Sequence, residues 1–146
     1  MGFSAVKDAF YDRWKTLIEL GGDGGAATFT VYPRSGRTEP ASGPWARVSI
    51  RFGPRERADF GSSTVRRREV GVFYVEFMVE KETGERALDT FGDRVKAAFE
   101  SKGFGGVVTH DLSRHNAGRD DADENDELGR WAREVFSLPF VYDDVS

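Results

Sequence analysis

Two histidines, His110 and His115, are the residues in this chain best suited to acid–base or metal chemistry. They lie five positions apart in a segment that we interpret as a strand, so they would face opposite sides if that strand is regular. Asp111 lies beside His110, but no G-x-S-x-G motif supplies a nucleophile and no H-E-x-x-H motif supplies a zinc site. The pattern therefore favours a surface or interface role for both histidines over a catalytic one.

A run of acidic residues before the last predicted strand invites a calcium-binding interpretation. Asp121, Asp123 and Asn125 fit positions one, three and five of an EF-hand loop. However, Asp126 occupies the position that needs glycine, and Ala132 occupies the position that needs a bidentate glutamate. The EF-hand is therefore excluded. We favour a solvated loop whose charges repel one another, with loose cation binding as the alternative.

A glycine-rich stretch, GGDGG at 21–25, is similar to a phosphate-binding loop only in composition. A P-loop requires G-x-x-x-x-G-K-[ST], and no lysine follows here. A dinucleotide-binding turn follows a strand and opens a helix, whereas this stretch follows a predicted helix and precedes a predicted strand. We interpret it as a helix stop joined to a flexible linker.

Five arginines flank one predicted loop, with Arg55 and Arg57 near its start and the run 66–68 just after it. Three successive arginines in a strand cannot share a face, so at least one points inward or the run lies outside the ladder. Two interpretations stay open. The charges protect a strand edge against aggregation, or they form a basic arm that meets acidic residues of a neighbouring subunit or DNA phosphates.

The candidate site is therefore a subunit or partner interface, with no residue assigned to catalysis, to a cofactor or to a metal. Opposite charges on two separate loops suit a ring in which the arm of one subunit meets the acidic loop of the next. The residues assigned to this interface are Arg47, Arg51, Arg55, Arg57, Arg66, Arg67, Arg68, Asp120, Asp121, Asp123 and Glu124.

These charges need a scaffold, and the stretch from Glu69 to Phe104 is expected to form its centre. Its first eleven residues are dense in β-branched and aromatic side chains on both faces, which indicates a central strand with something packed on each side. An amphipathic helix is predicted over 85–102, because apolar residues recur there at helical spacing. Gly103 is well suited to end it.

The remaining elements are shorter. A helix over 3–20, with Ser4 as its cap, and strands over 28–32, 45–52, 105–113 and 131–142 are expected. The connection 53–64 is long for a hairpin and predicts a protruding arm or a partly disordered loop. Pro139 cannot donate to a ladder, so the last strand is an edge there or has a bulge.

The fold class that follows is α+β, in one domain over residues 1–146. We expect a four- to five-stranded, mostly antiparallel sheet with two helices packed on one face. The net charge of −4 gives no support for nucleic-acid or membrane binding, and the lack of cysteine excludes disulfides and thiol catalysis. No apolar run is long enough to span a bilayer, and the first residues lack signal-peptide features, so a cytoplasmic compartment is expected.

Several short motifs and the layout of these elements resemble the tail terminator, or tail-completion, proteins of long-tailed bacteriophages. The first motif is a Pro-Trp that enters a strand with Arg two residues on, in GPWARVSIRFG at 43–53. The second is the V-x-F-containing strand VGVFYVEFMVE followed by the helix GERALDTFGDRVKAAFE. The third is the final F-x-x-P-F in WAREVFSLPFVYDD. The resemblance covers about residues 3 to 143.

The resemblance implies a non-enzymatic structural protein of the virion tail, without a cofactor, assembled in the host cytoplasm. Such proteins form a ring, usually a hexamer, at the end of the tail tube, and the ring stops polymerisation of the tube. The implied partners are other copies of the chain, the tail tube protein and a neck or head-completion protein. DNA passes through the ring without sequence-specific contact. The family has no catalytic motif, so no residue role is transferred.

Two other classes of function stay open at this stage. A nucleic-acid-binding sheet domain would use Arg66 to Arg68 together with exposed aromatic residues such as Trp45 or Tyr74. A small-molecule α+β enzyme is the third possibility, although no catalytic set of residues is recognised in the sequence. Retention on DNA that depends on salt would favour the nucleic-acid hypothesis.

Overall fold

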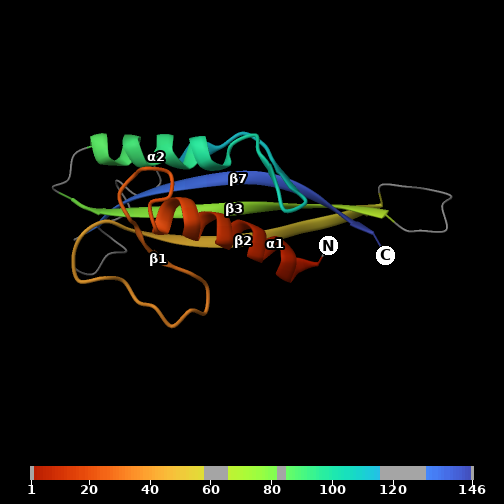
Figure 1. Ribbon diagram of the computed structural model, residues 1–146, viewed down its shortest axis with the longest axis horizontal. Coiled ribbons are helices and arrows are strands. Elements are labelled where there is room, and N and C mark those ends of the chain that lie inside the picture. Colours follow the sequence, from red (N-terminus) through yellow and green to blue (C-terminus); the bar gives the residue numbers. More distant parts are fainter. Residues whose placement is uncertain (1, 58–65, 82–84, 116–130, 146) are drawn as a thin grey trace.

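The computed structural model describes residues 2–57, 66–81, 85–115 and 131–145. Figure 1 shows how its helices and strands are arranged. They are α1 (Phe3–Trp14), the short π-helix η1 (Lys15–Glu19), β1 (Phe29–Val31), β2 (Trp45–Arg57), β3 (Arg66–Glu80), α2 (Glu85–Phe99), β4 (Gly103–Phe104), β5 (Val107–Thr109), β6 (Ser113–His115) and β7 (Trp131–Val145).

One mixed sheet joins the strands of the described part of the chain. Their order is β1-β2-β3-β7-β5-β4, and β6 also pairs with β7. β1 runs parallel to β2, while the other pairings of these strands are antiparallel. The α+β class is confirmed. The expectation that most pairings are antiparallel is confirmed, but the predicted number of four or five strands is wrong: in the described part of the chain the sheet has seven strands, and it is mixed because β1 is parallel to β2.

Two segments account for the larger sheet. The strand expected at 105–113 is divided into β5 and β6, because residues 110–112 between them are not in a strand. Ahead of β5, Gly105 and Gly106 adopt positive φ angles of 54° and 83° and turn the chain between β4 and β5. The connection 32–44 brings the chain back to the end of the sheet where β1 begins. β2 therefore starts beside Phe29 and pairs with β1 in parallel.

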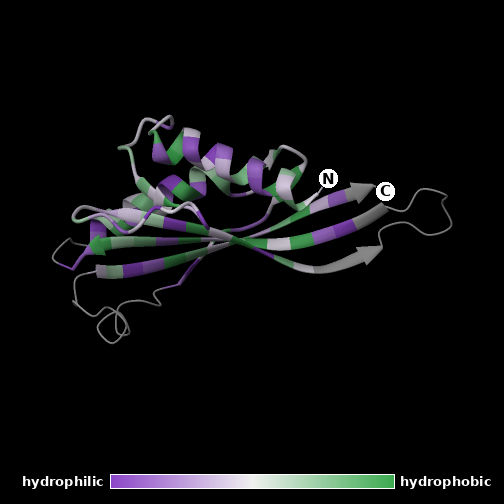
Figure 2. Ribbon diagram, turned by 90° about the horizontal axis from the view of Figure 1, so that it is seen from below, coloured by the Kyte–Doolittle hydropathy of each residue, from purple (hydrophilic) through white to green (hydrophobic). Residues whose placement is uncertain are grey.

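Both helices pack on the same face of the sheet, as expected (Figures 1 and 2). The core between the layers is aromatic. The ring of Phe91 on α2 stacks on Phe77 of β3 with centroids 3.7 Å apart, and Phe10 on α1 stacks on Phe73 of β3 at 4.7 Å. β3 is thus the central strand against which both helices are anchored, as its apolar density predicted.

The first helix differs from the prediction in its details. It begins at Phe3 after Gly2, and no side chain caps it, so the expected Ser4 cap is wrong. The α-helix ends at Trp14, and a π-helical turn continues as far as Glu19. Its last turn is closed by the N–H of Leu20, which donates to the carbonyl of Lys15 at 2.9 Å.

The strands β2, β3 and β7 continue beyond both helices at the end of the molecule where the C-terminus lies (Figure 1). We call this extension, residues 53–57, 66–70 and 141–145, the arm. The pairing of β2 with β3 continues as far as Arg57 and Arg67. The protruding-arm interpretation of the connection is therefore confirmed for its strand portions, and residues 58–65 lie outside the described part of the chain.

Pro139 lies in the middle of β7. On the edge of β7 that faces away from β3, it falls in the gap between the short strands β5 and β6. β6 pairs with residues 135–137 and β5 with residues 140–142. The carbonyl of Pro139 accepts a hydrogen bond from the N–H of His110 at 2.9 Å on that outer side. The missing N–H of Pro139 points to the same outer side, because both backbone groups of a strand residue face one edge. The ladder with β3 is unaffected.

Candidate interaction surface

The side of the sheet that carries neither helix, called the open face below, is built by the alternation of residues along the strands. Register pairs place Ser49, Tyr74 and Ser137 across one line of this face, and Arg51, Val72 and Pro139 across the next. Their neighbours in sequence point into the helix-covered core. The alternation predicted for 45–52 is confirmed in β2, since Ala46 and Val48 are fully buried and Arg47 is exposed.

One end of the open face is covered rather than exposed. There Trp45, Met78 and Trp131 form a small second core, each at most 6% exposed, with Val31 packed against it. The two indole rings meet edge to face with centroids 6.2 Å apart. The indole N–H of Trp45 is buried and finds no hydrogen-bond acceptor among the described residues. Trp45 is therefore not available as the exposed stacking platform that a nucleic-acid interpretation would use.

A polar belt crosses the middle of the open face. Glu76 of β3 lies between two arginines: Arg47 Nη1 is 3.2 Å and Arg133 Nη1 is 3.8 Å from its carboxylate oxygens. The guanidinium of Arg51 lies over the ring of Tyr74, 5.8 Å from its centroid. These groups remain partly exposed, so each exposed ion pair contributes on the order of 0–1 kcal/mol to stability.

Toward the arm the open face becomes an apolar groove of about 410 Å³. Its floor is formed by Val70, Val72, Pro139 and Val141, and Arg51 lies at its rim. A neighbouring hollow of about 550 Å³ extends the groove past Val108, which is 51% exposed. The valine and proline side chains of these two hollows form a partly exposed apolar patch on the open face.

The two histidines both face this side of the molecule, so the prediction that they face opposite sides is wrong. His110 lines the groove beside Pro139 and Val141. His115 is paired in register with Val135, and its Nε2 lies 3.1 Å from the Oγ of Ser137. The reason is that the segment between β5 and β6 is not a regular strand, so the alternation is interrupted.

The arginine run 66–68 lies inside the ladder, between β2 on one side and β7 on the other. Register places Arg67 opposite Asp144 and Arg68 opposite Asp143. The guanidinium of Arg68 is 4.0 Å from the Asp143 carboxylate, and both groups are solvent-exposed to at least a third. Asp143 of β7 is thus a partner of Arg68 that the sequence analysis missed, although the sequence DD at 143–144 was visible there.

The remaining predicted interface residues divide into two groups. Arg55 and Arg57 belong to β2, and Arg66 and Arg67 belong to β3, all within the arm. Asp120, Asp121, Asp123 and Glu124 lie outside the described part of the chain. Pairing between the basic arm and the acidic loop of another subunit therefore stays a prediction.

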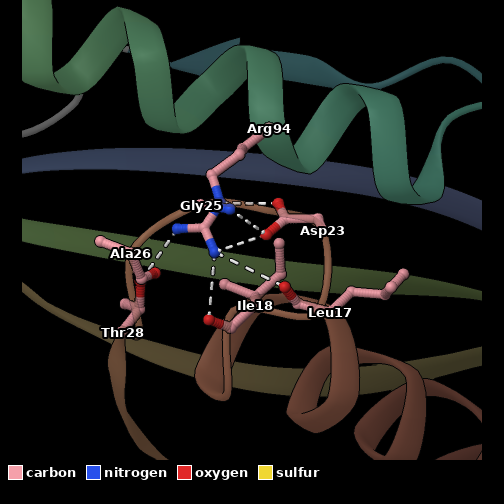
Figure 3. A network of polar contacts seen from close by, with 7 residues as sticks. All are labelled: Leu17, Ile18, Asp23, Gly25, Ala26, Thr28 and Arg94. Atoms are coloured by element: carbon pink, nitrogen blue, oxygen red, sulfur yellow. Dashed lines mark hydrogen bonds and ion pairs between the residues drawn. The ribbon is translucent and has the colours of Figure 1, made fainter.

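An unpredicted polar network ties the glycine-rich turn to α2 (Figure 3). Arg94 binds the carboxylate of Asp23 through Nε at 2.7 Å and Nη2 at 2.9 Å, and Nη2 also donates to the carbonyl of Ile18 at 3.2 Å. Hydrogen bonds from Arg94 lower the pKa of Asp23 below its ordinary value, and the opposing effect of burial is smaller. A Cβ on Gly25 would collide with this guanidinium. GGDGG is therefore an ordered turn held by hydrogen bonds to Arg94, and the prediction of a flexible linker is wrong.

A second network neutralises an acid in the helix-covered core. Glu134 on β7 is only 3% exposed, and Arg114 of β6 binds its carboxylate. Arg114 also reaches Asp89 on α2, with Nη1 2.7 Å from Oδ1. Burial disfavours the charged guanidinium, but the hydrogen bonds that Arg114 donates to Glu134 and Asp89, together with the attraction of their charges, outweigh it and raise the pKa of Arg114. Arg114 thus links three elements, and no sequence motif marked it.

Within the described ranges, no three histidine, cysteine, aspartate or glutamate side chains gather closely enough to hold a metal ion. The helices of those ranges are also too short or too polar to cross a bilayer.

Comparison with known proteins identifies a fold and nothing more specific. No family model matches the chain, and no curated protein matches it. A solved structure matches with a TM-score of 0.65 and 17% sequence identity, and the match covers 97% of this chain and 96% of that one. The name of that protein describes no function. At this identity the likeness shows a shared α+β fold over nearly the whole of both chains.

Proposed function

We propose that this protein is a structural subunit of a phage tail. In this proposal, copies of the chain form a ring that caps the tail tube, stops its polymerisation and contacts the neck of the head. The resemblance to tail terminator proteins implies that the ring is a hexamer. Its proposed partners are the tube protein and a neck protein. It works by binding and has no catalytic activity.

The observation that carries the proposal is the contrast between the two faces of the sheet. Helices bury the core side completely, with Phe73 and Leu138 at 0% exposure. On the open face, Val72 and Val141 remain partly accessible beside a groove. A subunit that only had to fold would gain by covering these residues, whereas a ring subunit needs a surface for its neighbours.

The placement of ionisable groups also supports a binding role. Arg94 is committed to Asp23, Arg114 to Glu134, and Arg47 to Glu76. Each pair joins two separate elements of the fold, which is the behaviour of structural pairs. A catalytic group needs a reacting atom within reach in a cleft, and the groove is floored by valine and proline side chains.

Electron microscopy of tails tests the proposed function. Tails assembled with the protein present should have uniform length and join to heads, and tails assembled without it should overgrow and remain headless. A variant with Val72→Asp and Val141→Asp provides a sharper version, because it places two charges on the groove floor. Normal tails with that variant, or with no protein at all, would contradict the proposal.

A nucleic-acid-binding sheet domain is the second candidate, and one observation favours it. Tyr74 lies on the open face under the guanidinium of Arg51, an arrangement suited to stacking a base. Binding of single-stranded DNA or RNA that weakens in Tyr74→Ala and falls steeply with salt would support this candidate. The same oligonucleotides showing no binding at low salt would exclude it.

A further inference from the structure

The groove on the open face has a regular apolar floor. Val72 of β3 lies opposite Pro139 of β7, and Val70 lies opposite Val141 in the same ladder. Alternate residues of a strand point to one face, so these four side chains form a compact platform between the two strands. All four remain at least partly exposed to solvent.

Two basic side chains stand on opposite sides of this platform. Arg51 of β2 is paired in register with Val72, and the backbone N–H of His110 donates to the carbonyl of Pro139 at 2.9 Å. These four residues therefore occupy neighbouring positions across the sheet, about 14 Å from end to end at the usual spacing of strands. Both basic residues line the groove.

The second row of the floor carries no charged group at its ends. On the β2 side lies Gly53, where a Cβ would approach Cγ2 of Val70 to 2.8 Å. On the other side Val108 is paired in register with Val141 and is 51% exposed. A molecule in the groove thus meets one apolar row beside a row with a basic residue at each end.

The charge of the groove is not balanced within the described part of the chain. The described residues that line it include no aspartate or glutamate, and the two ionisable ones are Arg51 and His110. On the same face of β2, Arg47 has the carboxylate of Glu76 at 3.2 Å. Arg51 instead lies over the ring of Tyr74 and makes no ion pair with a described residue.

This imbalance determines which occupant the groove suits. A molecule that covers the apolar floor also removes water from the guanidinium of Arg51 at its rim. Desolvation of a charge is costly unless a hydrogen-bonded opposite charge offsets it. A neutral or basic occupant would leave this arginine unpaired, whereas an acidic one would pair it. The groove therefore suits an occupant that is apolar at its centre and acidic at its edge.

The shape and chemistry of the floor favour a protein segment as that occupant. The groove of about 410 Å³ continues into the hollow beside Val108, so apolar side chains can follow one another along it. Nucleic acid binds such sheet surfaces by stacking its bases on aromatic rings, whereas the floor of the groove is made of valine and proline. A protein segment supplies both aliphatic side chains and carboxylates.

We propose that the groove binds an acidic, apolar segment of another protein, with aliphatic side chains on the floor and a carboxylate paired with Arg51. The inference rests on the proposed function, since it names the chemistry of the partner that covers this surface. His110, on the far side of the floor, offers a second polar contact to the same segment.

Selection from a library of random short peptides tests this chemistry without assuming a partner. The library is selected on the full-length protein, and peptides that also bind the double variant Val72→Gln, Pro139→Gln are removed. Glutamine is uncharged, so this removal favours peptides of neither charge. Circular dichroism and thermal unfolding verify that the double variant folds. If it does not, Pro139→Gln alone, at an exposed position, takes its place.

The peptides that remain depend on the groove floor. They should carry aspartate or glutamate next to aliphatic or aromatic residues. Remaining peptides that are basic, or apolar without an acid, would overturn the proposal. The absence of any peptide that depends on the floor would overturn it too.

Charge reversal then locates the carboxylate of a selected peptide. Arg51→Glu should weaken its binding, measured by fluorescence anisotropy, about tenfold. Arg86→Glu makes the same change at an exposed position of α2 and should leave the affinity unchanged. A peptide with lysine in place of its acid should bind wild type weakly and recover affinity for Arg51→Glu. Without that recovery, the carboxylate lies elsewhere and the proposal fails.

Competition identifies the class of macromolecule that the groove accepts. A single-stranded oligothymidylate should fail to displace the acidic peptide, even at low salt. Displacement would assign the groove to nucleic acid and would overturn the proposal.

The outcomes distinguish this inference from the proposed function. If tails require the protein but the selected peptides are not acidic, the tail role stands and only the inference fails. If acidic peptides bind through Arg51 but tails are normal without the protein, the binding site stands and the tail role fails.

Discussion

The body of the molecule and its arm are made of the same three strands, yet they differ in what surrounds them. In the body, α1 and α2 cover β2, β3 and β7, and Phe73, Val75 and Phe136 are at most 1% exposed. In the arm the ladder between β3 and β7 continues without interruption, while both helices have ended (Figure 2). Backbone hydrogen bonding is therefore continuous along the sheet. Burial continues into the arm at Glu69 and Tyr142, which are 3% and 2% exposed, and exposure rises beyond them at Arg68 and Asp143.

The charged residues show the same contrast. In the body, Arg114 reaches a glutamate that is 3% exposed, and Arg94 makes bidentate contact with Asp23. In the arm, Arg68 is 4.0 Å from Asp143 and both groups face solvent. Buried pairs fix the arrangement of elements in one chain, whereas exposed ion pairs contribute little to stability.

The largest effect is expected from opening the core of the body. Phe73→Ala removes a ring that contacts Phe10, Trp14 and Phe99, and a cavity between the sheet and both helices results. The free energy of unfolding should fall by about 3–5 kcal/mol. Denaturant unfolding measures it. A loss below about 1 kcal/mol would mean that burial under the helices is not the main source of stability.

The next effect tests the buried pair of the body. Arg114→Ala removes the guanidinium from Glu134, and the free energy of unfolding should fall by about 2 kcal/mol, because hydrogen bonds to charged groups are strong and Arg114 is partly exposed. Asp89→Asn is the matched control, since it removes only the exposed member of the network. It should change stability by less than about 1 kcal/mol. Equal effects would mean that burial of Glu134 is unimportant.

Sequence periodicity predicted the body well, and for a physical reason. The stripe Leu88, Phe91, Val95 and Phe99 has to be covered, and only a sheet face is available to cover it. The strict alternation at 45–52 likewise determined which side of β2 faces the helices. The class of fold and the packing of two helices on one face follow from these patterns.

Long-range pairing could not be predicted in the same way. The parallel position of β1 depends on where the loop 32–44 returns, and local residues do not encode that endpoint. The partners of Arg94 and Arg114 are 71 and 20 residues away in sequence, so no spacing rule marks them. The two aspartates at 143–144 could be recognised in the sequence, but their backbone register opposite residues 67–68 could not be predicted from it. The position of Arg47 and Arg51 on the open face was recognised by alternation, and the groove beside Arg51 was not.

A smaller and pH-dependent effect is expected at the glycine-rich turn 21–25. This turn follows η1 and is held against α2 by the contact between Asp23 and Arg94. Asp23→Asn weakens the contacts with Arg94, and the free energy of unfolding at pH 7 should fall by about 1 kcal/mol. The pKa of Asp23 is lowered in the folded protein, so its contribution is present above the unfolded pKa of about 4 and is lost as the pH falls through the folded value. Wild type and variant should therefore begin to converge in stability below about pH 4 and have equal stability only below the lowered folded pKa. Curves that remain parallel down to acid pH would contradict the role of Asp23.

The smallest change in stability is expected in the arm, and it compares the two faces directly. Val141→Thr replaces one methyl group by a hydroxyl on the partly exposed floor of the groove, so the free energy of unfolding should change by less than about 0.5 kcal/mol. Val75→Thr makes the same replacement on the helix-covered face, where the side chain is 1% exposed, and should cost about 1–3 kcal/mol. Denaturant unfolding of both variants at one low protein concentration gives the comparison, since assembly would otherwise add stability to the wild type. If Val141→Thr costs as much as Val75→Thr under these conditions, the floor of the groove is already covered within one chain, and the open face would then have no apolar surface left to offer a neighbouring subunit.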